Sequence, residues 1–319
     1  MPAVIAHHVF ARRVLRRLEQ NGVPVFCRSA ADIGAQGPDM LFFHRVFPWE
    51  PGKSYARQGV AIHHLPPARL FDCFRRTVCR TPPGPEREAM LGYLEGFLCH
   101  YALDRTAHPF VLFWQERLAE AEPFYSPRIN QYHHRIESAL DTLTLRRMTG
   151  RRIRDFRLNE MIPAASPLRD HAIGELYRPV LGELIGLPHV RTEQLASAPA
   201  DMRRALTYMT DRRHLRERLL YRPAEALLHQ GPFLSALIRP EEPGRDYANR
   251  EHRRWTNPFT GAVSRADFFE LMEEATGAAA QMIPAFLEAL ENGRPMREIV
   301  GLLDFSGEPL GPSVAYTGY

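Results

Sequence analysis

The sequence predicts an all-α protein built as a multi-helix bundle. Apolar residues recur at helical intervals through most of the 319-residue chain, and no stretch alternates apolar and polar residues as a strand does. Hydrophobic residues make up 45% and charged residues 24% of the composition, which is typical of globular domains and disfavours disorder or a coiled coil. We find no internal repeat and no low-complexity tract, so a repetitive architecture is disfavoured as well.

Helical periodicity dominates the first half of the chain. The predicted helices cover residues 4–21, 67–81, 86–108, 110–121 and 128–149. The first ends at Gly22 and the last at Gly150, because glycine readily terminates helices. Pro109 is expected to end or kink the long helix, since proline lacks the N–H that would bond to the carbonyl of Arg105. Residues 23–66 are rich in Gly and Pro and are expected to form long loops with a short helix.

The second half is also predicted to be helical. Its expected helices lie near residues 168–186, 199–210, 213–230, 265–291 and 294–303, and the tail 304–319 is expected to be extended. We divide the chain into residues 1–165 and a helical extension, residues 166–319. Because no linker composition separates them, the two are expected to pack as one compact unit.

Composition also restricts the cellular context. No apolar run approaches the roughly 18–20 residues of a membrane span, and Met1-Pro2-Ala3 is not followed by the apolar region of a secretory signal. We therefore expect a cytoplasmic protein without a transmembrane segment. The four cysteines lack C-x-x-C spacing and are expected to be reduced thiols; they are Cys27, Cys73, Cys79 and Cys99.

The positive charge says little about a partner. The formal net charge is +4, but Lys53 is the single lysine, and an arginine excess of this kind is what a GC-rich coding bias produces. The arginine runs at 146–157 and 212–218 are therefore interpreted as solvated faces. A serine hydrolase and a Walker-type nucleotide site are disfavoured because neither motif is present.

The most informative motif is a row of three residues on one predicted helix. His100, Asp104 and His108 lie at positions i, i+4 and i+8, which share one helical face. The two histidines are then about 12 Å apart along the axis, too far to share one tetrahedral ion with bonds of about 2.0–2.1 Å. The spacing suits two neighbouring ions with Asp104 between them.

A second helix offers a shorter pattern of the same kind. His133 and Glu137 form an i, i+4 pair, and Asp141 follows one turn later. Metal binding competes here with a simpler interpretation. The row can be a buried polar face satisfied by hydrogen bonds, and the pair can be a solvated contact of a few tenths of a kcal/mol. Spacing alone leaves both interpretations open.

Further strings in the first half extend the pattern. The string AHHVFA contains His7 and His8, GAQGPDMLFF contains Asp39, and GVAIHH contains His63 and His64. Together with GFLCHYALDRTAHPF and YHHRIES, they resemble the zinc-dependent phospholipase C family, relatives of the single-strand-specific zinc nucleases. The resemblance covers about residues 3–145 and depends on five motifs in the order of that family. It implies the bundle fold of that family, here with additional C-terminal helices.

The resemblance also implies a set of zinc ligands. One ion would be held by Asp39, His63, His100 and Asp104. A second ion would be held by His108, His133 and Glu137.

A third ion in the secreted relatives uses the first histidine, here His7, with the aspartate corresponding to Asp104. It also uses the amine and carbonyl of an N-terminal Trp, which this chain does not offer, so two or three zinc ions are expected. His8 and His64 are the fallback choices for His7 and His63, and Asp141 is expected to orient a ligand histidine.

The function that follows is hydrolysis of a phosphodiester. Clustered zinc ions lower the pKa of water and neutralise charge on a phosphoryl group. Asp39 is the candidate catalytic residue, because a carboxylate on a loop can also orient or deprotonate the attacking water. The expected substrate is a phospholipid or another phosphodiester. The alternatives are a zinc nuclease acting on single-stranded nucleic acid and a metal-binding helical scaffold without catalysis. Exact substrate, oligomeric state and the role of residues 166–319 stay open.

Overall fold

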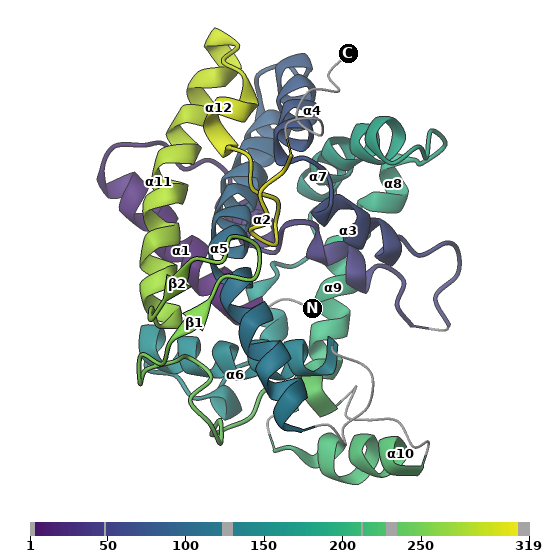
Figure 1. The fold of residues 1–319 in the computed structure, drawn as a ribbon. Coiled ribbons are helices and arrows are strands. Elements are labelled where there is room, and N and C mark those ends of the chain that lie inside the picture. The colour runs from purple at the N-terminus through teal and green to yellow at the C-terminus, as the bar shows by residue number, and fades with distance from the viewer. Residues whose placement is uncertain (1–3, 48, 123–129, 212, 228–234, 312–319) are drawn as a thin grey trace.

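Helices make up about two thirds of the molecule. The computed structural model describes residues 4–47, 49–122, 130–211, 213–227 and 235–311 (Figure 1). It is 67% helical, which confirms the all-α class. The α-helices are α1 (Val4–Gln20), α2 (Arg28–Gly34), α3 (Ala56–His63), α4 (Pro67–Arg80), α5 (Pro85–Ala121), α6 (Asn130–Thr149), α7 (Pro167–Pro179), α8 (Thr192–Leu195), α9 (Ala198–Met209), α10 (Arg222–Leu227), α11 (Phe268–Asn292) and α12 (Met296–Val300).

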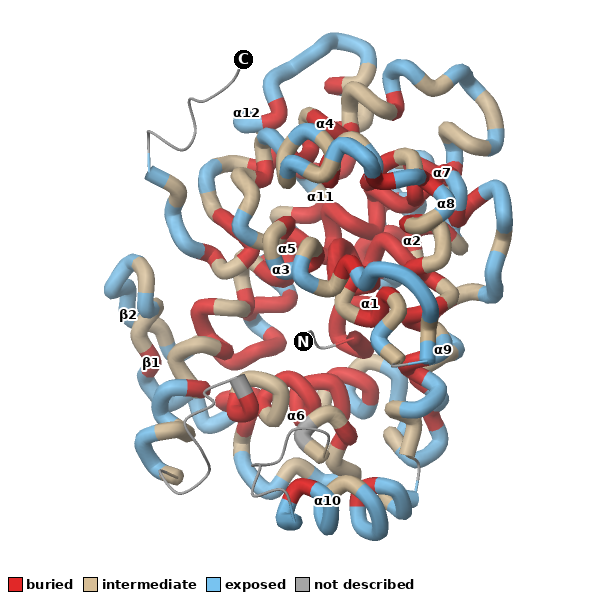
Figure 2. The backbone as a smooth tube through the Cα atoms, turned by 90° about the vertical axis from the view of Figure 1, so that its right-hand side faces the viewer, coloured by how far each residue is buried: buried red, intermediate tan, exposed pale blue. Residues whose placement is uncertain are grey.

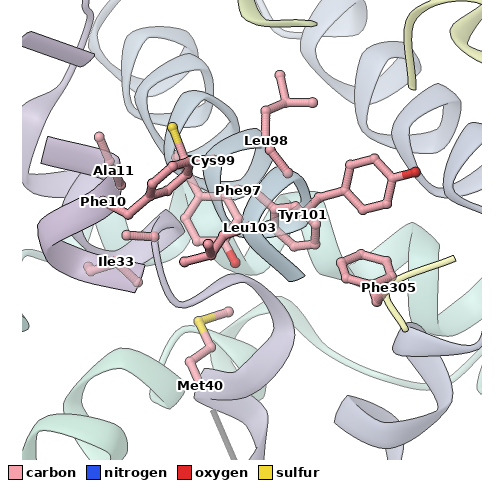
Figure 3. Packing of buried hydrophobic residues seen from close by; sticks show 14 of the residues in the cluster. Phe10, Ala11, Ile33, Met40, Phe97, Leu98, Cys99, Tyr101, Leu103 and Phe305 are labelled. Atoms are coloured by element: carbon pink, nitrogen blue, oxygen red, sulfur yellow. The ribbon is translucent and has the colours of Figure 1, made fainter. Parts of the chain in front are cut away.

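The long helix α5 is the centre of the fold. It packs against α1, α2, α6, α7 and α11, and its middle is buried (Figures 1 and 2). Its sequence explains this position, because apolar residues lie on all sides of the stretch 89–104 rather than on one stripe. Side chains of α1, of α2 and of the C-terminal segment, residues 301–311, pack against it. Figure 3 shows Phe10, Ile33 and Phe305 beside Phe97 and Tyr101.

The expected end or kink at Pro109 is corrected in one respect. The helix does not end there, and Pro85–Ala121 is one helix of 37 residues with Pro109 inside it. The Arg105 carbonyl loses its helical donor to proline. Gly307 of the C-terminal segment lies against that carbonyl oxygen and against the Pro109 ring. A contact with a distant segment therefore covers the place where local sequence predicts a break.

The region 23–66 contains more structure than the sequence suggests. Besides α2 and α3 it holds a 3-10 helix, Gly37–Phe43. These elements are short, so their apolar periodicity is too brief to stand out between Gly and Pro residues. The remaining short 3-10 helices are Ile153–Asp155, Leu158–Met161 and Ser235–Leu237.

The second half follows the predicted helices with local departures. Residues 168–186 form α7 followed by a π-helical turn, Val180–Leu184, and a second π-turn, Glu217–Tyr221, precedes α10. Three predicted elements extend beyond the described residues: the helix 128–149 at residues 128–129, the helix 213–230 at residues 228–230, and the tail at residues 312–319. A two-stranded antiparallel hairpin, β1 (Trp255–Thr256) and β2 (Val263–Ser264), was not predicted because each strand has two residues.

The two halves share their interior. One cluster of buried hydrophobic residues includes side chains of α1 and α5 together with side chains of α7, α11 and α12. Among the described residues, no helix combines the length and the apolarity that crossing a membrane requires. The four cysteines are free thiols, as expected.

Candidate metal centre

Histidines and carboxylates from five elements meet on one side of α5, and α5 is one of the five. His7 comes from the first turns of α1, Asp39 from the 3-10 helix Gly37–Phe43, and His63 from the end of α3. The row of α5 contributes three residues and α6 contributes two. The eight predicted ligands fall into three groups whose ligand atoms lie within 4.8 Å of one another; these are Asp39–His63–His100, His7–His100–Asp104 and His108–His133–Glu137.

The first group surrounds Asp39. Nε2 of His63 lies 3.1 Å from Oδ1 of Asp39, and Nε2 of His100 lies 3.7 Å from Oδ2. Both carboxylate oxygens of Asp39 and the Nε2 of His100 are buried, and no described residue gives them a hydrogen bond. A buried polar atom without a partner is costly, so these atoms form an incomplete polar site.

The second group is joined to the first through His100. Nε2 of His100 lies 3.1 Å from Oδ2 of Asp104, and Nε2 of His7 lies 3.1 Å from Oδ1 of the same carboxylate. The rings of His7 and His100 stack with centroids 4.3 Å apart. Asp104 is thus placed between two imidazoles, as a bridging ligand would be.

The third group lies one turn further along α5. Nε2 of His133 lies 3.0 Å from Oε1 of Glu137, and Nε2 of His108 lies 4.0 Å from the same oxygen. Nδ1 of His108 also lies 3.5 Å from Oδ1 of Asp104, which links this group to the other two. His100 and His108 belong to different groups, in agreement with the separation that their spacing predicts.

Hydrogen bonds of the ring nitrogen Nδ1 fix the orientation of these imidazoles. Nδ1 of His63 donates to the Gly59 carbonyl at 2.7 Å, and Nδ1 of His108 donates to the Phe305 carbonyl at 2.9 Å. A carbonyl oxygen only accepts, so Nδ1 carries the proton. In the neutral ring, Nε2 is then a lone-pair donor that faces a carboxylate.

His100 and His133 repeat this arrangement. Nδ1 of His100 faces the Ala35 carbonyl at 3.3 Å, and Nδ1 of His133 faces Oε1 of Gln115 at 2.8 Å. Lone pairs of nitrogen and carboxylate oxygen repel unless a proton or a metal cation lies between them. Two donor atoms bound to one tetrahedral zinc ion lie about 3.3 Å apart. The Nε2 atoms of His63, His100 and His133 lie 3.0–3.7 Å from carboxylate oxygens, which is close to that separation.

Burial makes the charge balance of the cluster important. Asp39, Asp104 and Glu137 are each at most 5% exposed, and their close partners are histidines. Burial alone would raise the pKa of Asp104, but the imidazoles of His108, His100 and His7 outweigh it and hold that pKa well below its usual range. Glu137 behaves alike: burial opposes ionisation, and His133 with other neighbours lowers its pKa well below the ordinary value. The carboxylates of Asp104 and Glu137 are thus ionised and require positive charge nearby.

The histidines divide according to their neighbours. Burial would lower the pKa of His7, but the Asp104 carboxylate raises it overall, and Asp39 does the same for His63. Burial lowers the pKa of His100 and of His133, and their carboxylates offset this only in part. The latter two rings are therefore held neutral, which is the form that binds a metal ion.

Gly37 permits the close approach of the Asp39 segment to α5. Its φ is +50°, and a Cβ at this position would lie 2.4 Å from Cδ2 of His100. Any side chain here would push the 3-10 helix away from the imidazole. Glycine is therefore required before Pro38 for two reasons: the positive φ of the turn and the close contact with His100.

The fallback residues lie elsewhere. His8 is buried, but its Nδ1 lies 3.7 Å from Oδ1 of Asp32, away from the cluster, and burial lowers its pKa to about 4. His64 is exposed at the end of α3. Successive helical residues point about 100° apart, so only one member of each His-His pair can face the cluster, and these are His7 and His63.

The expected role of Asp141 is corrected. Its Oδ1 accepts a hydrogen bond from the Ala6 amide at 2.8 Å, and its Oδ2 accepts one from Nε of Arg239 at 2.9 Å. Rows at i, i+4 and i+8 drift about 40° per step, which turns Asp141 from the histidines toward α1. Asp141 therefore fixes the start of the helix that carries His7 instead of orienting a ligand ring.

A fourth group of possible ligands has a different explanation. His252, Asp267 and Glu270 lie close together near the start of α11. Asp267 and Glu270 form a capping box, in which each side chain accepts from the other's backbone N–H. His252 and Glu270 are exposed, so this group caps a helix.

Two contributions to the cluster were not predicted. The Phe305 carbonyl and the Gln115 amide hold His108 and His133. Gln115 lies two turns beyond His108 on the same helix, so α5 periodicity contains a weak signal for it. Phe305 is 197 residues from His108, and no local pattern points to such a contact.

Comparison with protein-family models, with curated proteins and with solved structures finds no match to this chain. The chemistry of the cluster itself is therefore the basis for assigning a function.

Proposed function

We propose that the cluster binds zinc as a polynuclear centre and that the protein hydrolyses a phosphodiester, as its resemblance to the zinc-dependent phospholipase C family implies. One observation carries this proposal. The Nε2 atoms of His63, His100 and His133 face buried carboxylates, while their Nδ1 atoms are directed to carbonyl or amide oxygens. This is the arrangement of histidines whose outer nitrogen is held by a second partner and whose inner nitrogen binds a metal.

The residues fit the ligand sets that the resemblance implies. Asp39, His63, His100 and Asp104 would hold one ion, and His108, His133 and Glu137 would hold another. His7 and Asp104 would contribute to a third ion, which would need further ligands besides these two side chains. Three carboxylates among five imidazoles form a donor set that suits zinc better than calcium or magnesium, which prefer oxygen ligands.

The residues of this chain have separate tasks in the proposed reaction. Bound zinc supplies activation of water and neutralisation of phosphoryl charge. Asp39 orients the attacking water and accepts its proton, because both its oxygens are directed into the cluster without a donor from the described chain. The side chains of His63, His108 and His133 are 16–19% exposed, whereas His100 is fully buried. The substrate therefore approaches along the edge that these three rings form.

A phosphodiester is the substrate class that this chemistry fits. Its anionic oxygens would be neutralised by the positive charge that bound zinc supplies, and phospholipids are the substrates that the resemblance suggests. A cytoplasmic location is part of the proposal and is supported by four free cysteines, which reducing compartments maintain.

The proposal is tested with the purified full chain on a chromogenic phosphocholine ester and on single-stranded nucleic acid. We expect release of the chromophore that stops after chelation and returns with zinc. His100→Asn should lower the rate at least about a hundredfold, whereas His64→Asn, which changes an exposed histidine, should leave it unchanged. Preferential cleavage of nucleic acid would favour a nuclease. Zinc binding without turnover of either substrate would instead indicate a non-catalytic scaffold.

A further inference from the structure

The segment 213–227 has its polar and apolar residues inverted relative to an ordinary surface helix. Its two buried residues are Glu217 and Glu225. Its leucines are exposed instead, with Leu219 at 69% and Leu220 at 60% of full exposure. A surface helix in water normally turns such leucines toward the core, so this face is built to meet something other than water.

Polar contacts hold the segment in this orientation. Glu217 accepts from Nδ1 of His214 at 2.6 Å and from Nε of Arg222 at 2.9 Å. Glu225 accepts from the amide of Ser235 at 2.9 Å and from its hydroxyl at 2.7 Å. Turning the leucines inward would break the bonds between Glu225 and Ser235 and would expose two carboxylates, so these contacts favour the orientation in which the leucines face outward.

The charge of this face is entirely positive. The only acidic residues of the segment are the two buried glutamates. Arg213, Arg216 and Arg218 are exposed, and no carboxylate of the described residues forms an ion pair with any of them. These three arginines belong to the run 212–218 that is expected to be a solvated face, and in the structure they border a row of exposed leucines.

The segment lies at one end of the molecule. α10 projects below α6 in Figure 1 and again in Figure 2, where its outer side is exposed. The segment therefore lies at the periphery of the described fold.

We infer that the segment 213–227 docks onto an anionic lipid bilayer. Leucines of such a face enter the boundary between headgroups and acyl chains, and the arginines that border them pair with lipid phosphates. Nucleic acid fits less well, because it would engage the arginines and leave the leucines in water. The inference concerns a surface outside the metal cluster and does not depend on the proposed hydrolysis.

Sedimentation with vesicles tests this inference on the full chain. We expect binding to vesicles of phosphatidylcholine mixed with phosphatidylglycerol, weak binding to phosphatidylcholine alone, and weakening of the former by salt. Leu219→Ser/Leu220→Ser should lower the partition coefficient about tenfold or more, and Arg218→Gln about fivefold. Leu168→Ser changes a leucine of α7 that is 49% exposed and should have no effect.

Three results would overturn the inference. They are failure to bind mixed vesicles, binding that the leucine and arginine changes do not alter, and a dimer of this chain that the leucine change dissociates. Because the changed side chains are exposed, unchanged thermal melting of the variants would exclude misfolding as the cause of lost binding.

Discussion

At the scale of single residues, the direction of each ring nitrogen determines what the cluster can bind. His7 and His8 are neighbours on α1, yet Nε2 of His7 lies 3.1 Å from Asp104 and Nδ1 of His8 lies 3.7 Å from Asp32. Both are buried, so burial alone does not distinguish a ligand from a structural histidine. The partner does, because Asp104 belongs to a group of imidazoles and Asp32 forms an ion pair with Arg12.

These two histidines provide a matched pair of variants. His7→Asn should lower the zinc content of the purified chain and its affinity for zinc about tenfold or more, because one ligand of the His100–Asp104 group is lost. His8→Asn should keep the zinc content of the unchanged chain. Elemental analysis after dialysis measures both, and equal zinc in the two variants would exclude His7 as a ligand.

Glu95 gives a prediction about pH and stability. It is 1% exposed on α5, and burial raises its pKa to about 8, although the Phe26 amide and Arg28 act in the opposite direction. The folded chain therefore holds a proton that the unfolded chain releases near its ordinary pKa of 4.5. The stability that this proton contributes is present at low pH and is lost as pH rises to about 8.

Glu95→Gln should remove this dependence, because glutamine stays neutral. We compare the unfolding free energy of the variant with that of the unchanged chain. The difference, variant minus unchanged chain, should be about 2–4 kcal/mol larger at pH 9 than at pH 5. Urea unfolding at the two pH values measures the difference. A constant difference would mean that Glu95 is ionised in the folded chain at both.

At the scale of elements, the C-terminal segment after α12 completes the surroundings of His108. Its Phe305 carbonyl accepts from that imidazole, and its Phe305 ring lies 5.1 Å from the rings of His63 and Tyr101. Tyr101 donates to the carbonyls of Val300 and Leu303, which fastens the segment to α5. Residues far apart in sequence thereby determine how one histidine points.

Gly307 tests the importance of this segment. Its φ is +77°, and a Cβ would lie 2.4 Å from the Arg105 oxygen and 2.7 Å from Cγ of Pro109. Gly307→Ala should displace Phe305 and loosen zinc from the His108–His133–Glu137 group, seen as faster loss of metal to a chelator. Gly261→Ala is the control, since Gly261 has φ +71° but no atom near its Cβ position. Equal chelation rates in the two variants would contradict the role of the segment.

At the scale of the whole molecule, local patterns predict the helices and long-range packing determines the site. The all-α class, the C-terminal ends of α1 and α6 and the common face of His100, Asp104 and His108 follow from periodicity. The continuity of α5 through Pro109 and the hairpin at 255–264 do not, because the first opposes the local effect of proline and the second is too short.

The candidate site shows the same division. Ligand types and their order are visible in the sequence, and the structure brings all eight predicted ligands into the three groups. The direction of Asp141 toward Ala6 and the Phe305 contact were not predictable, because both depend on how α1 and the C-terminal segment pack on distant helices.

The metal content of the purified chain tests the central claim most directly. We predict more than one zinc ion per chain, a lower content in Asp104→Asn, and a fall in melting temperature when a chelator removes the metal, because ligand binding stabilises the folded state. A chain that retains no zinc after purification or reconstitution, and that melts at the same temperature with and without chelator, would contradict the account.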